Sequence, residues 1–296
     1  MRKILKGFVS IITAPFRWIS KAVMFFINKT FLSEFLAEDP EETPILDTIQ
    51  KATEKPRDFL ESLIEHLTSL RKHLFRSMFA LIIASALAFM NIEEIMDWLA
   101  QPIGGIGKLQ AIEVTEPVGV VMRITFLTGF AVSLPYISLE VLRFIAPGIS
   151  RKSRLLGLIG IPFVVFFFAG GLAFSYFVML KPALNVLTNF MNIQTILRPT
   201  SYFKFVTGLM FWIGIAFEFP LISFILSAMG ILPARLLKDQ WRLAFIILAI
   251  LAAMITPTID PINMMLVLLP LWSLYGLSIM MAYIAHRGGD KYQEAE

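Results

Sequence analysis

The chain has 296 residues, of which 57% are hydrophobic and only 16% charged, and its formal net charge is +4. A soluble domain carries about a quarter charged residues, so most of this surface must face lipid rather than water. The absence of cysteine excludes disulfides and cysteine-ligated metals. Three scattered histidines, His66, His73 and His286, share no ligand spacing with a carboxylate, so we expect no metal site.

The first 36 residues predict a basic amphipathic helix on the membrane surface. At 100° per residue, polar and basic side chains from Lys3 to Asn28 gather within about a third of the circumference, and apolar side chains fill most of the rest. A secretory signal peptide is the alternative, although Lys and Arg recur at positions 17, 21 and 29 within its apolar region. Residues 37–58 follow as an acidic linker that contains proline.

Six apolar runs follow the linker. The first four cover about residues 74–90, 118–139, 155–180 and 205–231, and each can cross a hydrocarbon core of about 30 Å at 1.5 Å per residue. The last two, about 243–255 and 264–284, are shorter, and the fifth reaches only about 20 Å. We expect an all-α membrane protein with six spans over residues 59–286, the last two short. A re-entrant pair that never crosses is the alternative for runs five and six.

Lys and Arg are distributed unequally between the two ends of these spans. If six helices alternate, one side receives twelve: Arg71, Lys72, Arg76, Arg143, Arg151, Lys152, Arg154, Arg235, Lys238, Arg242, Arg287 and Lys291. The other receives four: Lys108, Lys181, Arg198 and Lys204. The positive-inside rule makes the first side cytoplasmic. We therefore expect a protein of the cytoplasmic (inner) membrane with both termini and the tail 287–296 in the cytoplasm.

Five short segments occur in a specific order along these spans. They are His66–Leu74 (HLTSLRKHL), Gln101–Ile103 (QPI), Phe144–Gly148 (FIAPG), Gly214–Pro220 (GIAFEFP) and Thr256–Pro261 (TPTIDP). Together they resemble the motifs of the TatC family, whose members form the core of the twin-arginine protein translocase. The family has His-Leu-x-Glu-Leu-Arg-x-Arg-Leu before helix one, Phe-x-x-Pro-Gly-Leu in the first cytoplasmic loop and Phe-Glu-x-Pro in helix four. The resemblance covers residues 59–286 and leaves residues 1–36 unexplained.

The resemblance implies a curved six-helix bundle that receives signal peptides and exports folded proteins with the proton-motive force. It also implies partners, namely small single-span proteins of the TatA and TatB kind and twin-arginine signal peptides, in a homo- or hetero-oligomer embedded in lipid. The candidate signal-peptide residues are Glu65, Ser69, Arg71, Phe144, Pro147 and Ser153. The outer-side motif residues are Pro102, Pro257 and Asp260. Nucleic acid is not an expected partner.

The chain departs from the family pattern at two positions that matter for recognition. The family glutamates that receive the paired arginines align with Ser69 and Ser153. A carboxylate binds a guanidinium through two parallel charge-assisted hydrogen bonds, whereas a serine offers one neutral acceptor. Glu65 lies one helical turn before Ser69 and can substitute for the missing acid. A scaffold of the same family with altered peptide recognition is therefore an alternative.

Glu218 is a carboxylate in the middle of the fourth span, next to Pro220. A charge there costs at least about 2.5–3.5 kcal/mol on insertion scales, so it is expected to face a bundle interior and to serve as an intramembrane polar or partner site. A small proton-coupled transporter is the alternative function. No phosphate-binding loop, nucleophile elbow or zinc motif occurs, so we expect neither catalysis nor a cofactor.

Overall fold

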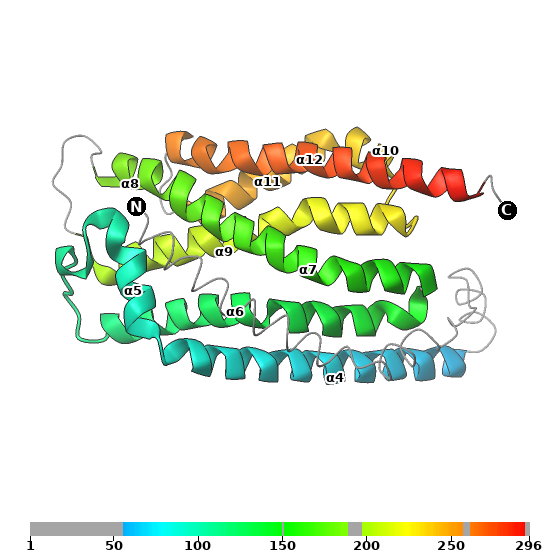
Figure 1. The fold of residues 1–296 in the computed structure, drawn as a ribbon, viewed down its shortest axis with the longest axis horizontal. Helices are drawn as coiled ribbons and strands as arrows, with labels where there is room; N and C mark the ends of the chain where they lie inside the picture. Colours follow the sequence, from blue (N-terminus) through cyan, green and yellow to red (C-terminus); the bar gives the residue numbers. More distant parts are fainter. Residues whose placement is uncertain (1–55, 150, 189–196, 257–260, 294–296) are drawn as a thin grey trace. The chain divides into compact units, whose positions relative to one another are not determined.

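The computed structural model describes residues 56–149, 151–188, 197–256 and 261–293, and within these ranges it is helical with no strand. The helices are α4 (Pro56–Phe89), α5 (Ile92–Ala100), α6 (Glu116–Ile145), α7 (Arg151–Phe174), α8 (Leu180–Thr188), α9 (Pro199–Ala228), α10 (Ala234–Asp239), α11 (Trp241–Ile255) and α12 (Pro261–Gln293) (Figure 1). Three 3-10 turns, η1 (Gln101–Ile103), η2 (Ile106–Lys108) and η3 (Ala146–Gly148), lie between them, and a π-helical turn, η4 (Ser175–Met179), joins α7 to α8. The all-α prediction is confirmed.

Five helical segments are long and apolar enough to cross a membrane. They are Ile64–Phe89, Glu116–Gly148, Ser153–Asn185, Pro199–Ala228 and Met264–Ala285, and the shorter apolar helix Trp241–Ile255 is the sixth element. The fifth helix is therefore short, as predicted. The sixth is longer than predicted, because α12 has 33 residues and continues past its apolar part. Hydropathy locates the apolar run, but nothing requires a helix to end where the lipid ends.

The N-terminal predictions fall mostly outside the described residues. This applies to the surface helix over 1–36 and to the linker as far as residue 55. The last three linker positions are an exception, because α4 already begins at Pro56. Proline suits the first turn of a helix, where its missing N–H would have no partner.

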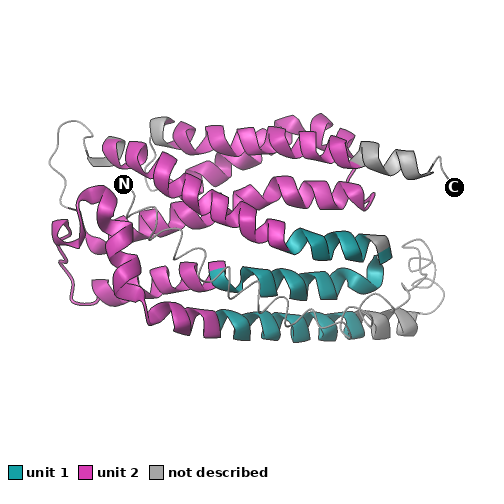
Figure 2. Cartoon of the chain, viewed as in Figure 1, with its two compact units in different colours: residues 1–82, 132–161 teal, residues 83–131, 162–296 magenta. Residues whose placement is uncertain are grey.

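The chain divides into two compact units, which are described separately (Figure 2). Unit 1 comprises residues 1–82 and 132–161, and unit 2 comprises residues 83–131 and 162–296. The described part of unit 1 contains the first part of α4, the second part of α6, η3 and the start of α7. Unit 2 holds the remaining helices and the larger apolar core.

In unit 2, α7 and α9 approach closely through two glycines. A Cβ added to Gly171 would lie 2.8 Å from the Cα of Gly214, and one added to Gly214 would lie 2.7 Å from the ring of Phe168. Small residues let membrane helices pack backbone to backbone without a hydrophobic driving force. Gly214 lies one turn before Glu218, so this contact also positions the intramembrane carboxylate.

Candidate functional site

Unit 1 is organised around a carboxylate with no exposed surface, Glu140 of α6. The Nδ1 of His73 lies 2.6 Å from its Oε2, and Nη1 of Arg143 donates to its Oε1 at 2.6 Å. The Nη1 of Arg76 lies 3.9 Å from Oε2. We call these four residues the Glu140 cluster. Burial of a carboxylate is costly unless it is paired and hydrogen-bonded, and these basic groups supply that pairing.

Helical spacing explains how the cluster assembles. His73 and Arg76 are three residues apart on α4, and Glu140 and Arg143 are three residues apart on α6, so each pair shares one helix face. Tyr136, one turn before Glu140, also hydrogen-bonds the carboxylate. The cluster therefore joins α4 to α6 through charge as well as packing.

Phe144 lies beside the same cluster and contacts the first sequence motif. Its ring centroid is 4.6 Å from that of His66 and 6.2 Å from that of His73. His66 and His73 are seven residues apart, two turns of α4, and so present their rings on one side. The structure thus brings together the segments His66–Leu74 and Phe144–Gly148, which are far apart in the sequence.

The other predicted signal-peptide residues of α4 and η3 lie near this contact with different exposures. Glu65 and Arg71 are exposed, Ser69 is partly exposed and Pro147 is exposed on η3. The guanidinium of Arg71 lies 5.6 Å from the ring centroid of Phe75 on its own helix. These residues share a region, but no hydrogen bond among the described residues links Glu65 to Ser69 or Arg71.

Ser153 and Arg154 are buried at the start of α7, which the sequence did not predict. The Nε of Arg154 donates to the carbonyl oxygens of Ala146 at 2.8 Å and Ile149 at 3.3 Å. The sequence assigned Arg154 only to membrane topology. Its side chain instead holds the η3 turn against α7 and so fixes the backbone around Pro147.

The described residues of unit 1 carry an excess of positive charge. Eight basic residues occur there, Arg57, Arg71, Lys72, Arg76, Arg143, Arg151, Lys152 and Arg154, with four acids, Asp58, Glu61, Glu65 and Glu140. Glu140 is buried and already paired, whereas the carboxylate of Glu65 is exposed. No local sequence pattern predicts the pairing of Glu140 with His73, because the two residues are 67 positions apart.

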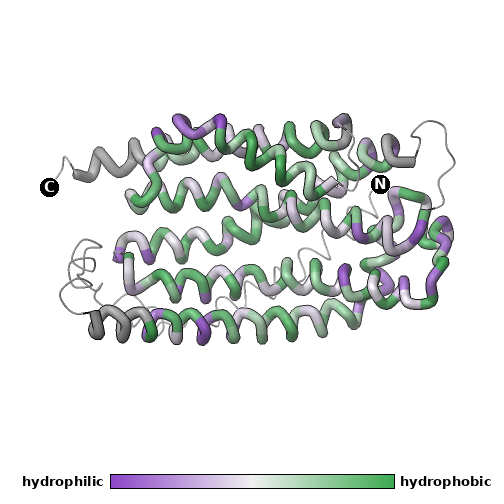
Figure 3. The backbone as a smooth tube through the Cα atoms, turned by 180° about the vertical axis from the view of Figure 1, so that it is seen from behind, coloured by the Kyte–Doolittle hydropathy of each residue, from purple (hydrophilic) through white to green (hydrophobic). Residues whose placement is uncertain are grey.

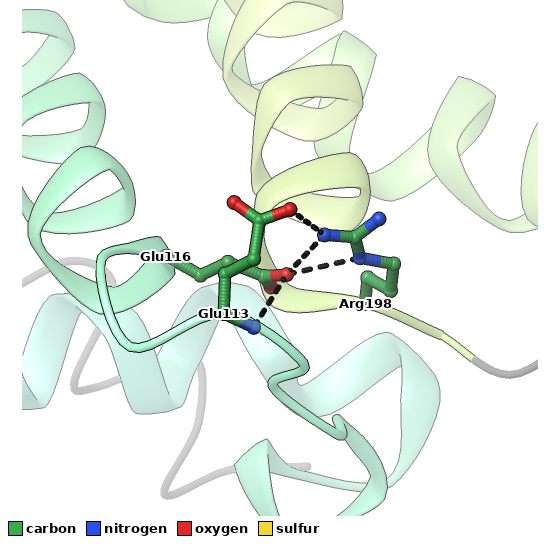
Figure 4. Close-up of polar contacts among 3 residues, drawn as sticks. All are labelled: Glu113, Glu116 and Arg198. Atoms are coloured by element: carbon green, nitrogen blue, oxygen red, sulfur yellow. Dashed lines mark hydrogen bonds and ion pairs between the residues drawn. The ribbon is translucent and has the colours of Figure 1, made fainter.

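A second charged group, the Arg198 clamp, links two loops of unit 2 (Figure 4). The Nε of Arg198 donates to Oε1 of Glu116 at 2.9 Å, and its Nη2 donates to Oε1 of Glu113 at 3.0 Å and also to Glu116. These hydrogen bonds raise the pKa of the Arg198 guanidinium above its usual value. The clamp ties the start of α6 to the residue before α9, and no local sequence pattern predicts it.

Two tyrosines hold the segment that carries Pro102. The hydroxyl of Tyr176 donates to the Trp98 carbonyl at 2.7 Å, and that of Tyr202 donates to the Leu99 carbonyl at 2.7 Å. Pro102 itself is partly exposed in η1. Pro257 and Asp260 lie outside the described residues, so their predicted grouping with Pro102 stays a prediction.

Glu218 is buried in α9, and neither of its carboxyl oxygens has a hydrogen-bond partner in the described part of the chain. Pro220 is buried two residues later and cannot donate a backbone N–H inside the helix. Glu218 therefore differs from Glu140, which has its partners in place. A buried carboxylate without partners is the feature expected of a site that binds another polar group.

Comparisons with known proteins place this arrangement in one family. Residues 65–270 match the family model described as Sec-independent protein translocase protein (TatC). The chain is 31% identical over 228 residues to TatCd of Bacillus subtilis, covering 76% of this chain and 93% of that protein. It is 31% identical to TatC of Synechocystis, covering 71% of this chain and 83% of that protein. A crystal structure titled twin arginine translocase receptor TatC matches with a TM-score of 0.67 and 28% identity, covering 74% of this chain and 99% of that chain.

Proposed function

Since this chain belongs to the TatC family of Sec-independent protein translocases, we propose that it is the receptor subunit of a twin-arginine translocase. It is a multi-pass membrane protein of a transport family. The proposal places it in the cytoplasmic membrane with both termini inside, where it binds signal peptides and passes folded proteins outward. The proton-motive force drives export, and the chain itself catalyses no reaction.

The observation that carries this proposal is the contact between Phe144 and the histidines of the first motif. Two segments that match separate family motifs meet through the ring contacts of Phe144 with His66 and His73. Beneath them the buried Glu140 fixes α4 against α6. A site built on rigid helices and held by paired charge is preorganised for a ligand. We assign signal-peptide binding to this end of unit 1.

Glu65 is the proposed acceptor for an arginine of the signal peptide. It is exposed and one turn from the partly exposed Ser69, whose hydroxyl can accept a further hydrogen bond. Glu140 cannot serve without losing His73 and Arg143, because it is fully buried between them. The described residues of unit 1 have a net positive charge, which opposes a cationic peptide, so an exposed carboxylate such as that of Glu65 is needed for attraction.

Capture of a photoreactive twin-arginine signal peptide by the purified full chain tests the proposal. Glu65→Gln should weaken capture roughly tenfold or more, because a charge-assisted hydrogen bond contributes about 1.5–3 kcal/mol. A double-lysine peptide should bind the wild type less well than the twin-arginine peptide. The matched control is Glu94→Gln, which changes an exposed glutamate of α5.

Two results would count against this assignment. Equal capture of the two peptides by the wild type would remove twin-arginine recognition and favour the scaffold alternative. Full capture by Glu65→Gln would move the acceptor to another group.

We further propose that Glu218 is a contact for single-span partners of the TatA and TatB kind. Its buried and unsatisfied carboxyl group needs a polar partner, and a second transmembrane helix can bring one. Family membership leaves the proton-coupled transporter without support.

A further inference from the structure

Unit 2 contains an apolar cavity of about 330 Å³ that lies between α9, α11 and α12. Twelve aliphatic and aromatic side chains line it. On α11 these include Ile247, Leu248 and Leu251, which recur at the spacing of one helix face. Trp212 and Phe219 of α9 are seven residues apart and face the same space. We call this cavity the α11 groove.

The length of the groove matches one leaflet of a bilayer. Its lining on α11 runs from Ala244 to Ile255, which is about 16 Å at 1.5 Å per residue. Half of a hydrocarbon core of about 30 Å is about 15 Å. α11 itself has 15 residues, about 22 Å, and so cannot span the core alone. A short helix beside an apolar groove leaves room for a hydrocarbon chain.

The helix α10 lies at one end of the groove and carries positive charge. Ala234 and Leu237 of α10 pack on Tyr275, and the Tyr275 hydroxyl donates to the Leu237 carbonyl at 2.5 Å. Tyr275 also lines the groove, so α10 lies at its edge. Figure 3 shows the contrast, with α10 hydrophilic and most of α11 hydrophobic.

Three exposed basic residues lie in α10 and the first turn of α11. They are Arg235, Lys238 and Arg242, and none of them forms an ion pair within the described ranges. Asp239 is the single acid among them, so this end keeps a positive balance. The guanidinium of Arg242 lies 5.6 Å from the ring centroid of Trp241, an amphipathic residue typical of the membrane interface.

We propose that the α11 groove binds one anionic phospholipid, with an acyl chain along α11 and the phosphate at Arg235, Lys238 and Arg242. The apolar lining excludes a polar ligand, and the basic end selects a negative headgroup. The lipid completes the surface beside α11 where the helix is too short to do so. This inference stands apart from signal-peptide recognition, because no residue of unit 1 takes part.

Native mass spectrometry of the delipidated full chain tests the proposal with added phosphatidylglycerol or phosphatidylcholine. The wild type should retain phosphatidylglycerol preferentially. Changing Arg235, Lys238 and Arg242 together to Gln should remove this preference. Each lost charge should lower the affinity for phosphatidylglycerol roughly fivefold. Equal retention of the two lipids by the wild type would overturn the headgroup assignment.

The groove itself is tested by a matched pair of tryptophan substitutions. Ile247 lines the groove and Ile246 does not, although both are exposed on α11. Ile247→Trp should fill the groove and reduce retention of phosphatidylglycerol several-fold, while Ile246→Trp should bind like the wild type. Wild-type retention by Ile247→Trp would overturn the tail assignment.

A phosphatidylglycerol with a photoreactive group in its acyl chain identifies the occupant in membranes. Labelling of α9, α11 and α12 supports the proposal. A photoreactive residue at position 247 that crosslinks to a polypeptide and not to lipid would overturn it, because the groove would then be a helix-docking site.

Discussion

Two buried glutamates, Glu140 of unit 1 and Glu218 of unit 2, differ in their partners. Glu140 of unit 1 has no exposed surface, and His73, Arg143 and Arg76 surround its carboxylate. Glu218 of unit 2 is 7% exposed, and its carboxyl group has no hydrogen-bond partner among the described residues. Residue type and burial are the same, so the partners decide what each group can do.

Glu140 is a structural charge that is paired within unit 1, whereas the carboxyl group of Glu218 is available to bind another group. A buried ion pair contributes little net stability over a hydrophobic contact, but removal of one partner leaves an uncompensated charge. Glu140 therefore holds α4 and α6 in place and has no capacity left for a ligand. Glu218 forms no hydrogen bond among the described residues, so its carboxyl group is suited to a contact with another chain.

Glu140→Gln should produce the largest loss of stability. The substitution leaves His73 and Arg143 partly buried without their counter-charge, and breaking a buried pair costs about 3–5 kcal/mol. The low end of that range applies here, because both basic side chains keep some exposure. Denaturant unfolding in detergent measures the change, with Glu65→Gln as the exposed control on α4. A loss below about 1 kcal/mol would contradict the structural role.

Substitutions in the Arg198 clamp should cause an intermediate loss of stability. The loss should be larger for Arg198→Gln than for Glu113→Gln. Arg198→Gln leaves the buried Glu116 carboxylate short of its main donor, which costs about 1–2 kcal/mol. Glu113→Gln removes an exposed partner and should cost less than about 1 kcal/mol. The same unfolding assay compares the two. Equal losses would mean that both ion pairs act as surface contacts.

The sequence predicted the membrane helices well, because long apolar runs leave few alternative structures. It predicted none of the charged contacts that distinguish the two units. His73 and Glu140 are 67 residues apart, and Glu116 and Arg198 are 82 residues apart, so no local pattern connects them. Arg154 shows the same limit, because a buried arginine that caps a turn and an exposed one that sets topology look alike in a sequence.

The candidate site was predicted only as far as the family resemblance reached. The motifs selected Phe144 and the segment His66–Leu74, and the structure places them in contact. Ser153 was expected to replace an acid that receives a peptide, yet it is buried at the start of α7. The exposure of Ser153 depends on how η3 packs against the start of α7 through Arg154. Tertiary contacts determine this packing, and local sequence does not.

Glu218 should show the smallest change in stability and a clear change in function. Glu218→Gln keeps the shape of the side chain and breaks no hydrogen bond within the described ranges, so unfolding should shift by less than about 1 kcal/mol. Glu218→Ala should also insert normally, because removal of an intramembrane acid eases insertion.

Co-purification with single-span partners should fall for the Ala variant if Glu218 binds them. Retention of binding by the Gln variant would assign a hydrogen bond, and loss in both would assign the charge or proton. A Glu218→Gln protein that unfolds as easily as Glu140→Gln would erase the contrast between the two glutamates, since Glu218 would then have a structural role of its own.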